Sequence, residues 1–193
     1  MILISKDEIT KRALANSLKE LTKNNSLEKI TIKDISEHCG VNRQTFYYHF
    51  HDKFDLINWI YYSEAVESIS DYSNYDHWSK AIHKIFIYLS NNKTFYIKAL
   101  KMDGQNSFSN YLFNITHEII KKVVDDTVQT QEMNVTEKEK NFVADFYTHA
   151  LTGLTVQWIK DGLQETPESL TERIRDMIDG SVINTLSRYE KKS

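Results

Sequence analysis

The sequence contains few of the residues that make tight turns. Of its 193 residues, only five are Gly and one is Pro. A protein of many β-strands needs such residues at its frequent turns, so this class does not fit. Apolar residues instead recur at helical spacing along most of the chain. We therefore expect an almost entirely helical protein with about nine helices.

Cysteine, net charge and long apolar runs are also scarce. The single cysteine, Cys39, excludes an intramolecular disulfide and suits a reducing compartment. The net charge of −3 argues against non-specific coating of nucleic acid by the whole molecule. A helix that reads a DNA groove needs only a local positive patch. No apolar run approaches the roughly 18 residues that cross a bilayer, and the N-terminus lacks a signal-peptide pattern. We expect a cytoplasmic protein without membrane contact.

The patterns that carry catalysis or bind metal ions are missing as well. The chain has no nucleophile motif and no Gly-rich phosphate loop. None of its seven histidines lies four residues from another, and neither HExxH nor CxxC occurs. We therefore expect no catalytic residues, no metal site and no cofactor.

One stretch, residues 30–57, has the pattern of a helix-turn-helix. Apolar residues lie at helical spacing in two short segments, expected at 32–38 and from 43 onward. Gly40 lies between them, where a residue able to adopt a positive φ is needed. Thr31 and Asn42 precede the segments as N-caps. The second segment carries donors and aromatic rings rather than aliphatic side chains, which is typical of a helix that contacts DNA.

The candidate DNA contacts lie on this second segment. Arg43 and Gln44 are at its start, where Arg can pair with guanine and Gln with adenine, each worth roughly 1–3 kcal/mol of discrimination. Contact with phosphates, or with solvent alone, is the alternative for both. Further candidates for contacts with bases, phosphates, sugars or thymine methyl groups are Asn42, Thr45, Tyr47, Tyr48 and His49.

Two helices are expected at the end of the chain, at 136–160 and 167–189. The apolar residues of the first cover more than one of its faces, and such a helix must be packed on two sides. Gly180 lies within the second, where it would allow a close approach between helices. The most economical partner for the surplus apolar surface is the same pair of helices in a second copy. We therefore expect a two-fold homodimer sealed by a four-helix bundle.

Aromatic residues and two histidines are spread along the chain between positions 78 and 149. They predict either a filled core or the wall of a cavity that binds a small-molecule effector. A filled core is the more common outcome of aromatic residues at helical spacing. The residues expected around such a cavity are Trp78, Phe86, Phe108, Tyr111, Phe146 and Tyr147, with His117 and His149 as polar anchors.

The stretch ITIKDISEHCGVNRQTFYYHFHDKFDLI resembles the signature of TetR/AcrR-type bacterial regulators, and the resemblance extends over about residues 5–65. The matching residues are Thr31, Asp34, Ile35, Gly40, Val41, Thr45, Phe46, Tyr47, His49, Phe50 and Lys53. Cys39 stands where the family usually has a small residue at the turn, and Asn42 where it usually has Ser. In this family the positions of Tyr48, His49 and Lys53 commonly contact the DNA backbone. Thr31 offers its own amide and hydroxyl.

The resemblance implies an all-α dimer that binds double-stranded DNA. A three-helix DNA-binding domain, residues 1–51, would be followed by a helical regulatory and dimerisation domain, residues 52–193. The two DNA-binding domains would lie in successive major grooves of a near-palindromic operator, and an effector or partner would change their separation.

The segment from Phe146 to Pro167 resembles a subgroup that includes regulators associated with dihydroxyacetone kinase genes. This makes a protein co-regulator an alternative to the small molecule. A DNA-bound scaffold in chromosome or cell-division control is an alternative of another class.

Overall fold

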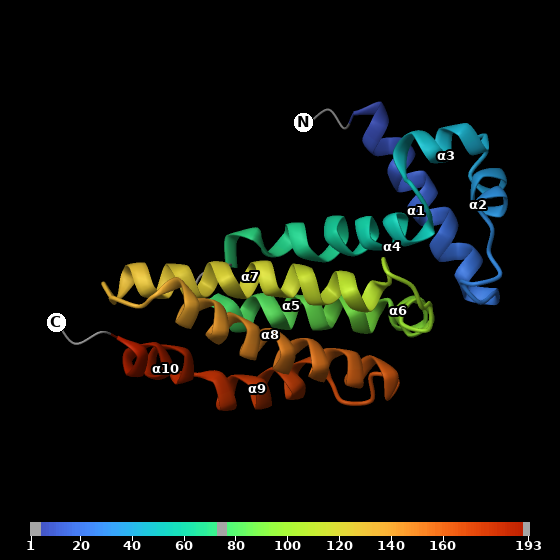
Figure 1. Cartoon of the computed structure of the whole chain (residues 1–193). Helices are drawn as coiled ribbons and strands as arrows, with labels where there is room; N and C mark the ends of the chain where they lie inside the picture. Colours follow the sequence, from blue (N-terminus) through green and yellow to red (C-terminus); the bar gives the residue numbers. More distant parts are fainter. Residues whose placement is uncertain (1–4, 73–76, 191–193) are drawn as a thin grey trace.

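The computed structural model describes residues 5–72 and 77–190, and these contain ten α-helices and no strand. Figure 1 shows a small helical unit at one end of a bundle of longer helices. We call the small unit, α1 (Lys6–Asn24), α2 (Ile32–His38) and α3 (Arg43–His49), the head. The all-helical prediction is confirmed.

Helices α2 and α3 of the head begin where the sequence predicts. Ser5, Thr31 and Asn42 each accept a hydrogen bond from the backbone amide three residues later, and so cap α1, α2 and α3. Gly40 turns the chain between α2 and α3 with a φ of +75°, a conformation that side chains with a Cβ avoid. Phe46 of α3 is completely buried against α1 and α2.

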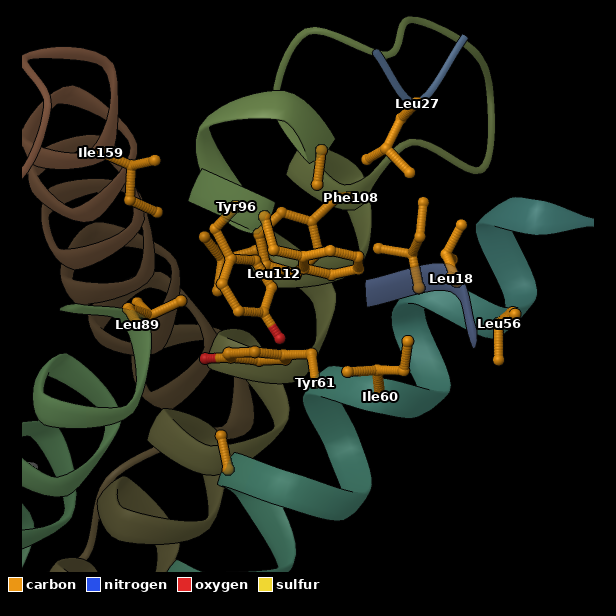
Figure 2. Packing of buried hydrophobic residues seen from close by; sticks show 14 of the residues in the cluster. Leu18, Leu27, Leu56, Ile60, Tyr61, Leu89, Tyr96, Phe108, Leu112 and Ile159 are labelled. Atoms are coloured by element: carbon orange, nitrogen blue, oxygen red, sulfur yellow. The ribbon is translucent and has the colours of Figure 1, made fainter. Parts of the chain in front are cut away.

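Helix α4 (Lys53–Tyr61) connects the head to the bundle. Asp52 caps its first turn. Leu56 and Ile60 lie in one apolar cluster with Leu18 of α1 and with Phe108 and Leu112 of the bundle (Figure 2). The helix continues into a π-helical turn, Tyr62–Val66, and a 3-10 segment, Glu67–Tyr72. Because α4 packs on both parts, the division at 51/52 remains a prediction.

The remaining helices form what we call the body. They are α5 (Trp78–Asn91), α6 (Lys93–Ala99), α7 (Phe108–Thr130), α8 (Glu137–Lys160), α9 (Pro167–Ile178) and α10 (Ser181–Tyr189). Helices α7 and α8 pack against each other, and α9 packs on α5. A second apolar cluster, with Val143, Tyr147 and Leu186 at its centre, lies where α7, α8 and α10 meet.

The helix expected at 167–189 is two helices, so the prediction of one continuous helix was wrong. Gly180 has a φ of +71°, and this left-handed residue ends the helical path between α9 and α10. A residue without a Cβ is therefore needed at position 180 for this turn, and not for the close approach between helices that the sequence suggested. The break accounts for the tenth α-helix.

Candidate nucleic-acid interface

Helix α3 exposes one polar and aromatic face. Phe46 anchors the opposite side in the head, while Arg43 and Gln44 are exposed in the first turn. Tyr47 is 52% exposed and Tyr48 81% exposed. Because these four positions follow the i, i+4 spacing of a helix, their side chains share one side of α3. This face carries a guanidinium, an amide and two phenols, all of them able to donate hydrogen bonds.

Asn42 and Thr45 hold the start of this helix in place. The Asn42 Oδ1 atom accepts hydrogen bonds from the Thr45 amide at 2.8 Å and from the Thr45 hydroxyl at 3.0 Å. Thr31 has a similar task at α2, because its amide and its hydroxyl both donate to the Asp34 carboxylate at 2.8 Å. The polar groups of these three residues therefore stabilise helix ends in this arrangement.

His49 lies at the end of α3 but points into the head. Its side chain is only 6% exposed, and its Nδ1 atom lies 3.0 Å from Asp7 Oδ1 of α1. Its ring meets the ring of Tyr48 edge-on at a centroid distance of 4.9 Å. Lys11, 2.9 Å from the other Asp7 oxygen, lowers the pKa of Asp7 and keeps it ionised. His49 thus joins α3 to α1.

Lys53 also points inward, toward the loop between α1 and α2. Its ammonium group donates to the carbonyl oxygens of Leu27, Glu28 and Ile30, the first at 2.7 Å. These three bonds match the three hydrogens of the group. Burial lowers the pKa of Lys53. The sequence alone does not reveal this role, because the carbonyls lie more than 20 residues away.

A polar chain that the sequence analysis missed links head and body. Lys19 Nζ of α1 lies 2.7 Å from Glu64 Oε2 in the π-helical turn. The Tyr88 hydroxyl of α5 donates to the same oxygen at 2.9 Å and lies 2.8 Å from the Tyr96 hydroxyl of α6. Burial raises the pKa of both Tyr88 and Tyr96, so both phenols stay protonated.

A second cation from the body holds the end of α1. Lys98 of α6 donates to the carbonyl oxygens of Thr22 and Asn25, the latter at 3.0 Å. A cation at this position also complements the negative end of the helix dipole. The head is therefore tied to the body at Lys19 and again at the last turn of α1.

The body contains an apolar cavity of about 100 Å³ between α5, α7, α8 and the end of α4. Three of the eight residues expected around an effector cavity line it, namely Trp78, Phe86 and Tyr147.

The other five expected cavity residues lie elsewhere. Phe108 is buried among Tyr61 and Tyr96 in the core. Tyr111 lines a separate polar cleft beside the start of α4. His117 pairs with Asp145 at 3.1 Å, and Phe146 and His149 face outward.

The outward face of α8 is apolar. Phe142 is 60% exposed, Phe146 62% and Leu154 47%, and the helical spacing of these residues places them along one side of the helix. Gly153 on the same side would meet no atom within 4 Å if it carried a Cβ. Single large apolar residues at the surface are ordinary, whereas here several of them follow one another along one helix.

The family assignment rests on two sequence models. A model described as "Bacterial regulatory proteins, tetR family" matches residues 19–59, and one described as "Transcriptional regulator C-terminal region" matches residues 76–180, more than half of the chain. The chain belongs to the TetR family. It is therefore a transcriptional regulator, and the family prediction is confirmed.

Individual proteins agree with this TetR assignment. The HTH-type dhaKLM operon transcriptional activator DhaS of Lactococcus lactis subsp. lactis (strain IL1403) is 27% identical over 159 residues, which are 82% of this chain and 84% of DhaS. The solved structure of the dihydroxyacetone kinase operon activator DhaS is 25% identical, with a TM-score of 0.71 over 95% of this chain and 99% of that one. The predicted subgroup resemblance is confirmed.

A more distant TetR-like structure shares the fold alone. NalD, the secondary repressor of the MexAB-OprM multidrug efflux pump in Pseudomonas aeruginosa, is 14% identical, with a TM-score of 0.59 over 97% of this chain and 100% of NalD. In the parts of this TetR chain that the structure describes, no helix is long and apolar enough to cross a membrane.

Lys53 and its carbonyl partners give a first prediction. In Lys53→Met, loss of the charge-assisted bonds lowers the free energy of unfolding by about 1–3 kcal/mol. Affinity for a duplex selected from a random pool falls at every salt concentration. The slope of log affinity against log salt stays unchanged, because no phosphate contact is lost. The control Lys160→Met removes the same charge from the end of α8. A slope shallower by about 0.9 in Lys53→Met would show a phosphate contact instead.

Glu64 gives a second prediction. In Glu64→Gln the charge-assisted contacts with Lys19 and Tyr88 weaken, so the head is held less firmly. We expect faster amide hydrogen exchange in α1 than in the unchanged chain, with α7 and α8 unaffected, measured by mass spectrometry. Glu67→Gln, an exposed neighbour in the 3-10 segment, is the matched control. Equal exchange in both variants would contradict a tie through Glu64.

Proposed function

We propose that this TetR-family regulator acts as a homodimer on a near-palindromic operator and is controlled through its body. The observation that carries the proposal is the exposed face of α3, set on a head whose other side is fully packed. A rigid helix with donors on its free face is what direct readout in the major groove requires.

Within this face, the residues have different tasks. Arg43 pairs with guanine and Gln44 with adenine, since both are exposed at the start of α3. Tyr47 and Tyr48 contact phosphates, sugars or thymine methyl groups. Asn42, Thr45 and Thr31 contribute through the helix ends that they hold. His49 and Lys53 position α3 and the loop before α2.

The second copy packs on the outward face of α8. Phe142, Phe146 and Leu154 give it an apolar row. Helix α8 forms half of a four-helix bundle together with the broken helix α9–α10, which takes the place of the single helix expected at 167–189. With a two-fold axis at this face, each contact between the two copies occurs twice. The two heads then address half-sites separated by about one turn of DNA, or a multiple of it.

Control comes from the cavity in the body, which receives a small molecule, or from a protein co-regulator on the body surface. The apolar cavity supports the first route. The similarity to DhaS, an activator of a dihydroxyacetone kinase operon, favours genes of that kind as the target. Mapping of the genomic binding sites tests this target, and sites remote from such genes would contradict it.

Arg43→Ala tests direct readout. We expect affinity for the selected duplex to fall by roughly 10- to 100-fold, because a bidentate contact with guanine is worth roughly 1–3 kcal/mol. Affinity for random duplex falls much less. Fluorescence anisotropy with both duplexes measures the difference. Arg173→Ala, an exposed arginine of α9, is the charge-matched control. Equal losses on the two duplexes would assign Arg43 to phosphates.

Phe146→Asp tests the dimer. A carboxylate at this position would be buried without a partner in the interface, so we expect a folded monomer by light scattering and a loss of operator affinity. Ile9→Asp places the same charge on an exposed apolar site of the head and leaves the dimer intact. A Phe146→Asp variant that stays dimeric would move the interface to another face.

A further inference from the structure

The cavity in the body has an almost wholly apolar wall. Aliphatic and aromatic side chains form most of it, among them Trp78, Ile82, Phe86, Ile119 and Leu151. Among the described residues, no charged side chain lines it. An ion would therefore lose its hydration in the cavity without gaining a partner of opposite charge. The wall selects for uncharged molecules.

Four of the residues that line this wall carry a hydroxyl group, and two of these groups are already bonded. Tyr147 shares a hydrogen bond of 2.7 Å with Ser181, and Thr155 donates to the Leu151 carbonyl at 2.8 Å. The hydroxyls of Tyr61 and Thr116 form no hydrogen bond with any described residue. Two lining residues of an otherwise apolar wall thus carry a hydroxyl group that is not bonded within the described parts of the chain.

Tyr61 is the more unusual of the two, because the residue is only 1% exposed. Its ring is held edge-on by Phe108 at a centroid distance of 5.3 Å and by Tyr96 at 6.0 Å (Figure 2). Buried phenols ordinarily find a hydrogen-bond partner. Burial raises the pKa of Tyr61, so the hydroxyl keeps its proton at neutral pH and is available as a donor.

We propose that the cavity binds a small, uncharged and mainly apolar molecule with one acceptor oxygen, and that this oxygen accepts a hydrogen bond from the Tyr61 hydroxyl. Its size is limited to a ring of about five atoms or a short branched chain, since the cavity of about 100 Å³ is smaller than the apolar cavity of about 150 Å³ that takes benzene. The regulatory consequence of this binding rests on the proposed function. The binding itself does not.

Tyr61 connects such a ligand directly to the head. It is the last residue of α4, the helix that begins beside the recognition helix α3. The next residues form the π-helical turn that carries Glu64, the partner of Lys19 in α1. Single π-helical turns of this kind are frequent at functional sites. A ligand bonded to Tyr61 therefore acts where α4 changes its helical path and where the head is tied.

Three probes of similar shape test the ligand class. They are cyclopentane, cyclopentanone, which has a carbonyl in place of a methylene, and cyclopropanecarboxylate, which carries a charge. Titrations followed by NMR of the Ile82 and Ile119 methyl groups measure their affinities. We expect cyclopentane and cyclopentanone to bind and cyclopropanecarboxylate not to bind. Binding of cyclopropanecarboxylate to the cavity, or failure of either neutral probe to shift these methyl signals, would overturn the proposal.

The variant Tyr61→Phe tests the hydrogen bond, because it removes one oxygen and keeps the ring. We expect affinity for cyclopentanone to fall about tenfold while affinity for cyclopentane stays within twofold. Tyr62→Phe, which removes the same atom from an exposed neighbour, changes neither affinity. Equal losses for both probes in Tyr61→Phe would reduce Tyr61 to a packing residue and overturn the hydrogen bond.

Operator binding is measured separately, first without probes and then with saturating cyclopentanone. A chain that binds cyclopentanone but no DNA would contradict the proposed function and leave the cavity assignment intact. A chain that binds both, with operator affinity unaffected by cyclopentanone, would overturn the regulatory role of the cavity alone.

Discussion

The double burial of α4 is the constraint on which the rest of the structure depends. Leu56, Ile57, Ile60 and Tyr61 are all almost fully buried, and they pack against the head on one side and the body on the other. Each such side chain contributes roughly 1.5–3 kcal/mol through burial. Separation of head and body would expose several of them at once. The head therefore cannot detach cheaply, and under the proposed control it would move together with α4.

Polar contacts around α4 would set the angle of such a movement. Apolar packing has little directional preference, but hydrogen bonds tolerate only narrow ranges of distance and angle. Lys19 with Glu64, and Lys98 with the end of α1, supply such directional contacts on the body side. Lys53 supplies them within the head. Two orientations of the head that share the same apolar core would thus differ mainly in these few contacts.

The sequence predicts what depends on neighbouring residues. The caps at Ser5, Thr31, Asn42 and Asp52 are predictable because each bond spans only three residues. The inward direction of the Lys53 side chain is not predictable, since its carbonyl partners are distant in sequence. The family pattern instead suggests that this residue contacts DNA phosphates. Aromatic spacing predicts that Phe108 and Phe86 are buried, but it cannot tell whether their neighbours meet or enclose a cavity. The apolar pattern around Gly180 fits one continuous helix and two helices separated by a turn equally well.

The small net free energy of a single hydrogen bond would limit how far a ligand in the cavity can shift the orientation of the heads. A ligand shifts a conformational equilibrium only by the difference between its affinities for the two states. One hydrogen bond contributes about 1 kcal/mol net, so a bond that forms in only one orientation of the head shifts that equilibrium about fivefold. In a dimer, two such cavities act on one operator-bound arrangement, and their effects multiply to about 25-fold. Dimerisation through α8 would then turn a modest contact at Tyr61 into a usable switch, which gives the exposed row on α8 a part in control as well as in assembly.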